Sequence, residues 1–77
     1  MQELALSALP VGTEATVKRV TGEGSLRRRL LEMGLIPGII IKIEGVAPLG
    51  DPVEVRVRGC LLTLRRNEAA SVFVGVD

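Results

Sequence analysis

Alternating apolar and polar residues are the dominant pattern in this chain, and they predict short β-strands. Between residues 53 and 58 valines alternate with charged residues, which is the two-residue period of a strand with one buried face. In the isoleucine-rich run 39–46, Ile41 and Ile43 share one face and Ile40 lies on the other. The strands predicted in this way cover residues 14–20, 39–46, 53–58, 60–65 and 71–76.

A second pattern, with apolar residues three and four positions apart, predicts one helix beginning near Ser25. Leu26, Leu30 and Met33 fall on one face at helical spacing. We expect the Ser25 hydroxyl to cap the first turn. Gly34 suits the left-handed position just beyond a helix end, where the next residue, a leucine, can fold back on Leu30.

Two shorter helical turns are also predicted. Residues 6–12 can form one turn that Pro10 and Gly12 close. A second turn follows the fourth predicted strand at residues 66–70, with Asn67 as a candidate cap.

These elements predict a small, mainly β domain over residues 1–77. Five short strands bury their apolar faces most easily in a closed or nearly closed barrel, because closure removes the exposed edges. An SH3-like five-stranded barrel with the helix inserted after the first strand fits this order best, and an oligonucleotide-binding barrel is the nearest alternative. Hydrophobic residues make up 47% of the chain and Phe73 is its single aromatic residue. The core is therefore expected to be aliphatic.

The inventory of reactive side chains argues against an enzyme, a high-affinity metal site or a cofactor site, and leaves open a weak metal site between chains. The chain has no histidine, and its single cysteine, Cys60, has no partner that could activate it as a nucleophile. We expect Cys60 to be a small buried or half-buried hydrophobic residue at a strand edge. The acids are scattered; the densest neighbourhood offers Asp51 and Glu54 alone.

Charge and hydropathy favour a soluble intracellular protein that is not inserted in a membrane. Ten lysines and arginines face nine acids, for a formal net charge of +1, so there is no strong general attraction to nucleic acid. No segment approaches the ~20 apolar residues needed to span a bilayer. A single cysteine also fits a reducing compartment.

Three consecutive arginines, Arg27, Arg28 and Arg29, raise the question of a binding surface. Successive helical positions are spread too widely around the axis to form one narrow stripe, and Arg28 is spaced to pair with Glu32. Three interpretations stay open in descending order: a solvated face whose arginine stems cover the barrel, a docking patch for an acidic protein, and a nucleic-acid contact. Single-strand binding usually needs aromatic platforms, which this chain lacks.

Four segments in order resemble the ferrous iron transport protein A family, the FeoA-like proteins. They are "LPVGTEATV" at 9–17, the arginine-leucine helix with Met-Gly-Leu and Pro-Gly at 29–38, "PLGDP" at 48–52, and Leu-Arg-x-x-Glu-Ala at 64–69. The resemblance covers nearly the whole chain. It implies an SH3-like barrel without enzymatic activity, a fold also found as the carboxy-terminal module of metal-dependent repressors. The family is often described as binding transition metal; without histidine, no tight site is expected here.

The resemblance further implies a cytoplasmic accessory protein that docks on the cytosolic part of a FeoB-type GTPase iron transporter and modulates it. The candidate contact residues are Arg27, Arg28, Arg29, Leu49 and Asp51. Leu49 is included because an apolar residue at a loop tip has no core reason to be there. Homo-oligomerisation through an edge strand is a further expectation, and the outward Ile40 hints at a covered surface.

Two alternatives to the docking function remain at this point. One is a nucleic-acid-binding barrel that uses outward-facing arginines on the strands, Arg56, Arg58, Arg65 and Arg66. The other is a stand-alone relative of the repressor module. We favour the transporter partner and expect no nucleic acid.

Overall fold

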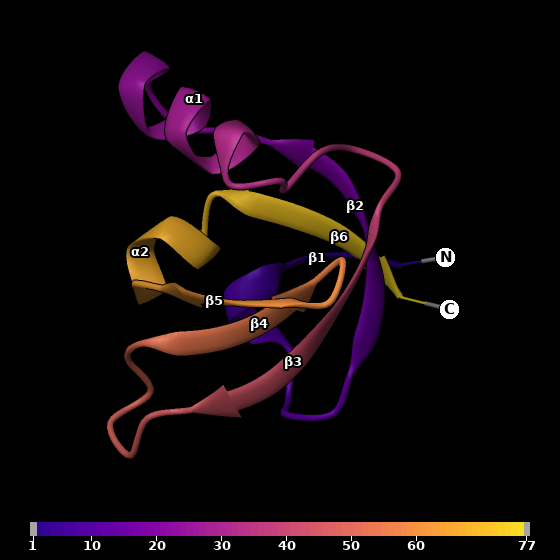
Figure 1. Cartoon of the computed structure of the whole chain (residues 1–77), viewed down its shortest axis with the longest axis vertical. Helices are drawn as coiled ribbons and strands as arrows, with labels where there is room; N and C mark the ends of the chain where they lie inside the picture. The colour runs from indigo at the N-terminus through magenta and orange to yellow at the C-terminus, as the bar shows by residue number, and fades with distance from the viewer. Residues whose placement is uncertain (1, 77) are drawn as a thin grey trace.

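A computed structural model describes residues 2–76 as a strongly curved antiparallel sheet with helices at one side (Figure 1). The elements in chain order are β1 (Gln2–Ala5), the 3₁₀ turn η1 (Leu6–Ala8), β2 (Glu14–Val20), α1 (Gly24–Glu32), β3 (Ile40–Val46), β4 (Val53–Val57), β5 (Cys60–Leu64), α2 (Arg66–Ala69) and β6 (Val72–Val76). The strand order is β1-β6-β2-β3-β4-β5. No ladder joins β1 to β5 within the described residues, so the barrel is open at that seam.

All five predicted strands are present, each within one residue of its expected bounds. A sixth strand, β1, was not predicted. Its sequence, Gln-Glu-Leu-Ala, contains residue types that are not enriched in strands, and it becomes a strand because it pairs along its whole length with β6, from Gln2 with Val76 to Ala5 with Phe73. The helical turns expected around residues 6–12 and 66–70 are η1 and α2.

The core is aliphatic, as predicted from the composition. Alternation places the three valines of β4 inside, and Ile41 and Ile43 of β3 are buried while Ile40 is 64% exposed. The largest fully buried side chains are Leu6, Leu30, Leu35, Ile41, Ile43, Leu64, Val17, Val55, Val72 and Val74.

Helix α1 ends as its sequence predicts. Gly34 has a φ of +103°, a conformation that costs little only for glycine. Its N–H donates to the carbonyl of Leu31 at 3.0 Å, and the N–H of Leu35 donates to the carbonyl of Leu30 at 3.2 Å. These two bonds define a Schellman motif, and the two leucines that it brings together, Leu30 and Leu35, are fully buried.

The predicted cap of α1, Ser25, is wrong, because this residue lies inside the helix. The helix begins at Gly24, and Glu23 is the cap residue, without a side-chain capping bond. The first helical bond runs from the N–H of Arg27 to the carbonyl of Glu23 at 2.9 Å. Ser25 therefore has helical backbone geometry, whereas a capping hydroxyl needs the extended geometry of the position before the helix.

Cys60 is exposed rather than buried. It follows the two-residue turn Arg58–Gly59 between β4 and β5, where both turn residues have positive φ. Cys60 stands at the tip of this hairpin, on a strand whose one neighbour among the described residues is β4. The expectation of a small buried hydrophobic residue is therefore wrong.

Candidate partner-binding surface

The three arginines of α1 have three different environments. The Nε of Arg27 donates to the carbonyl of Val20 at 3.1 Å, which anchors the helix to the end of β2. Arg29 forms an ion pair with Glu68. Arg28 is exposed, and the ion pair predicted with Glu32 is not formed in residues 2–76. Arg28 is therefore the arginine of this group with no internal role in the described part of the chain.

Glu68 is the buried charged residue among the described side chains, with 5% of its surface exposed. One carboxylate oxygen accepts the backbone N–H of Arg65 at 2.9 Å, and the other pairs with Arg29. A buried carboxylate needs such partners, because unpaired charge is costly away from water. Glu68 thus caps α2 and ties it to α1.

The sequence carries a signal for this role that the prediction of Asn67 as the cap overlooked. Glu68 is the third residue after the cap position of α2, which is the spacing of a glutamate that caps the backbone in a capping box. Asn67 lies inside the helix instead. The first N–H groups of α2 are taken by Glu68 and by Asp51, which leaves no capping role for the Asn67 side chain.

The loop between β3 and β4 contains the other two predicted contact residues. Leu49 is 94% exposed, as expected for a loop tip. Asp51 accepts the backbone N–H of Arg66 at 3.0 Å, and the side chain of Arg66 lies against Gly50, where an added Cβ would come within 2.7 Å of its Nη1. Asp51 therefore holds the loop against the start of α2.

Two contacts thus join α1, α2 and the loop into one surface. Figure 1 shows the three segments on the same side of the sheet, and the Arg29–Glu68 and Asp51–Arg66 contacts connect them. We call this surface the arginine face. Its members are Arg27, Arg28, Arg29, Leu49, Asp51, Arg65 and Arg66. Its charge is mainly positive, although the chain as a whole is nearly neutral.

Two features that a nucleic-acid interface would use, Arg56 and Phe73, are occupied by internal contacts, whereas Arg58, Arg65 and Arg66 form no ion pair in the described residues. Arg56 pairs with Glu44 at 2.9 Å and donates to the carbonyl of Gly59 at 3.2 Å. Phe73, the single aromatic residue, is covered by Arg19, whose guanidinium carbon lies 4.3 Å from the ring centroid. A base therefore finds no free stacking platform on this chain.

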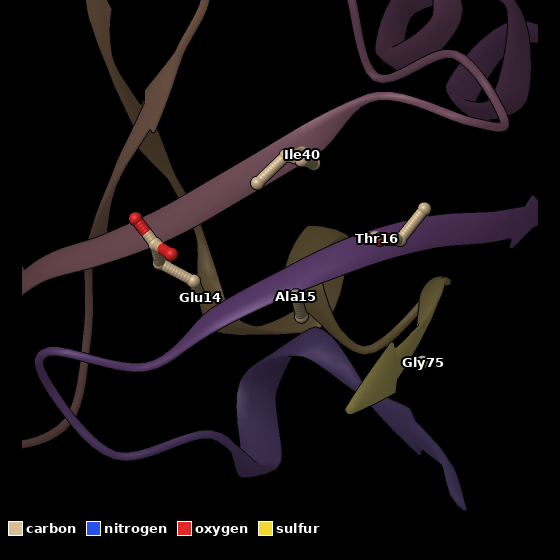
Figure 2. A pocket seen from close by; sticks show the side chains of 5 residues that line it. All are labelled: Glu14, Ala15, Thr16, Ile40 and Gly75. Atoms are coloured by element: carbon tan, nitrogen blue, oxygen red, sulfur yellow. The ribbon is translucent and has the colours of Figure 1, made fainter. Parts of the chain in front are cut away.

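A shallow hollow of about 230 Å³ lies on the outer face of β2 and β3 (Figure 2). Glu14, Thr16 and Ile40 rim it, and Gly75, paired with Thr16, leaves room because it has no side chain. Ala15 points to the opposite, buried side of β2. The single carboxylate of the hollow does not make a metal site, and no cluster of three potential metal-ligating acids, cysteines or histidines occurs in the described residues.

Comparison with known proteins decides the family. The FeoA domain model matches residues 4–76. The chain belongs to the FeoA family. A solution structure of FeoA from Chlorobium tepidum is 46% identical, with a TM-score of 0.87 over 95% of this chain and 70% of that one. The family predicted from the four sequence segments is therefore confirmed.

Two further relatives define the fold and the context of this FeoA domain. The zinc-complexed FeoA of Stenotrophomonas maltophilia, described as an SH3 domain protein, is 33% identical, with a TM-score of 0.82 over 94% of this chain and 89% of that one. The predicted SH3-like fold is thus confirmed. A fusion of Fe(2+) transport protein A with the transporter FeoB in Porphyromonas gingivalis is 42% identical over 71 residues, 92% of this chain and 8% of the fusion.

Length and hydropathy decide whether a helix could cross a bilayer. No helix among the described residues is both long enough and apolar enough to cross a bilayer. The longest, α1, has nine residues.

Proposed function

We propose that this chain is an accessory protein of ferrous iron uptake that docks, through the arginine face, on the cytosolic part of a FeoB-type transporter and modulates it. The P. gingivalis fusion carries the proposal: it joins a segment 42% identical to this chain to FeoB in one polypeptide. A covalent link holds two modules at high effective concentration, which is useful where the two act together. The S. maltophilia relative is described as a candidate activating factor of ferrous iron transport.

The composition of the arginine face indicates an acidic partner with an apolar pocket. Its acid, Asp51, is engaged by the N–H of Arg66 and Arg29 is paired with the buried Glu68, which leaves four arginines without an ion-pair partner in the described residues. Complementary charge steers association and sets specificity. Leu49, 94% exposed at the loop tip, is placed to be the apolar anchor that a partner buries.

Capture of this chain by the purified cytosolic domain of the transporter tests the proposal. Arg28→Glu and Leu49→Ser are the variants of choice, because neither side chain has an internal polar partner in the described residues. We expect Arg28→Glu to weaken capture about fivefold or more, as reversal replaces an attraction by a repulsion. Lys18→Glu makes the same charge change on β2, outside the arginine face, and serves as the control.

The capture experiment tests the docking function and the location of the contact separately. Failure of the unaltered chain to bind the transporter domain would contradict the docking function itself. Binding that both Arg28→Glu and Leu49→Ser leave unchanged would move the contact away from the arginine face. Equal weakening by Lys18→Glu would show that only total charge matters.

A further inference from the structure

Strand β5 forms one end of the sheet, and its outer edge has no strand beside it in the described residues. It pairs with β4 from Cys60 opposite Val57 to Leu64 opposite Val53. The other end of the sheet is β1, which has four residues and carries Glu3, paired with Arg19 at 2.8 Å. Its charged side chain protects that edge from further pairing. The two ends of the sheet are therefore not equivalent.

The hairpin turn decides which backbone groups of β5 are free. Arg58 and Gly59 have φ of +51° and +81°, the pattern of a two-residue type I′ turn. Such a turn makes Val57 and Cys60 a hydrogen-bonded pair. Alternation in an antiparallel ladder then turns the N–H and C=O groups of Leu61 and Thr63 toward the free edge. Neither residue makes a backbone bond outside the ladder within residues 2–76.

Nothing in β5 blocks a further strand. Its sequence, Cys-Leu-Leu-Thr-Leu, contains no charged residue and no proline, the usual devices that prevent edge pairing. Leu61 is 48% exposed and Thr63 is exposed. The inward-facing Leu62 is only partly buried, which fits a strand with an open side.

The charges at the two ends of β5 identify the kind of strand that fits. Arg58 precedes β5 and Arg65 and Arg66 follow it, and none of the three forms an ion pair within the described part of the chain. A second copy of β5 would bring arginines against arginines, because its two ends are both basic whichever direction it runs. Like charges placed opposite each other destabilise a strand pair, whereas an acidic strand finds complementary charge at both ends.

We propose that the free edge of β5 binds an extended acidic segment of a protein partner by strand addition. Main-chain bonds to Leu61 and Thr63 supply affinity, and the flanking arginines supply selectivity. The inference rests on the proposed function, because β5 runs directly into Arg65 and Arg66 of the arginine face. It adds the conformation and the charge of the segment that the partner presents.

A synthetic peptide tests the edge without the transporter. The probe is Val-Thr-Val flanked at each end by a glutamate pair, and the control peptide carries lysine pairs instead. On adding the acidic peptide at low salt, we expect the amide signals of Leu61 and Thr63 in ¹H–¹⁵N spectra to shift and their hydrogen exchange to slow. The lysine peptide should bind much more weakly, and added salt should weaken the acidic peptide.

Two variants isolate the edge. Thr63→Pro removes a free-edge N–H but no bond of the β4–β5 ladder, and proline is tolerated on edge strands in that orientation. We expect it to weaken the peptide about fivefold. Arg58→Asn removes a charge while keeping a residue type that accepts positive φ, and should weaken the peptide about threefold. Lys18→Gln is the matched control, with no change expected.

Several results would overturn the inference. Three of them concern the peptides: no binding at low salt, signal shifts confined to other strands, or equal binding of the acidic and the lysine peptide. The fourth is concentration-dependent dimerisation of the unaltered chain that Thr63→Pro abolishes, because a second copy would then occupy the edge. Capture by the transporter domain separates the two proposals. If the unaltered chain and Thr63→Pro are captured equally, the edge inference fails while the docking function stands.

Discussion

Replacing Glu68 by alanine tests how the arginine face is held together. This residue is 5% exposed, and its carboxylate has two partners on two helices, the backbone N–H of Arg65 and the guanidinium of Arg29. The alanine variant removes the cap of α2 and the tie between α2 and α1 in one step. The glutamine variant keeps an oxygen that can accept the Arg65 N–H, but it removes the charge.

The magnitude follows from these two contacts. Loss of the capping acceptor costs about 1 kcal/mol. The ion pair contributes about 1 kcal/mol, since the Arg29 side chain is 59% exposed and solvent screens the attraction. We therefore expect Glu68→Ala to lower the free energy of unfolding by about 2 kcal/mol, or the melting temperature by roughly 10 °C. Glu68→Gln should lose about half of that.

Urea unfolding followed by circular dichroism measures both variants, with the slope of the transition as a check on two-state behaviour. Arg29→Gln and the double variant complete a mutant cycle, which isolates the pair term. Stabilities of Glu68→Ala and Glu68→Gln within about 0.5 kcal/mol of the unaltered chain, the usual range for inconsequential surface changes, would refute the reasoning. So would a coupling energy near zero.

Two further predictions concern the backbone of the turns that hold the same face. Gly34→Ala should lower the free energy of unfolding by about 1–2 kcal/mol, because φ is +103° there. Gly45→Ala should change it by less than about 0.5 kcal/mol, since the atom 2.6 Å from the added Cβ belongs to the movable carboxylate of Glu54. Thermal unfolding compares the two variants, and equal losses would contradict a backbone origin of the effect. Asp51→Ala should cost about 1 kcal/mol through loss of the acceptor for the Arg66 N–H, and Asp51→Asn, which keeps an acceptor oxygen, should restore most of it in the same assay.

The strands could be predicted from the sequence because their signal is local. Alternation in β4 reflects which residues face the core, because the polarity of each side chain indicates the face of the sheet on which it lies. The end of α1 was equally readable, since Gly34 and Leu35 satisfy the Schellman pattern by themselves. In contrast, β1 is a strand only because β6, at the far end of the chain, pairs with it. Its own residues carry no such preference.

The candidate surface was predictable in its parts but not in its connections. The exposure of Leu49 followed from its place at a loop tip. That Asp51 caps α2 and that Arg29 reaches Glu68 depend on segments brought together only by the folded sheet.

These connections change how the predicted contact residues can be used. Reversal of all three arginines of α1 would break the Arg29–Glu68 pair and the Arg27 bond to Val20, so lost binding could reflect a displaced helix. Arg28 projects from the same helix without either contact. A binding defect of Arg28→Glu in a chain of unchanged stability therefore reports the partner contact itself, whereas the same defect in Arg29→Glu reports the contact and the helix position together.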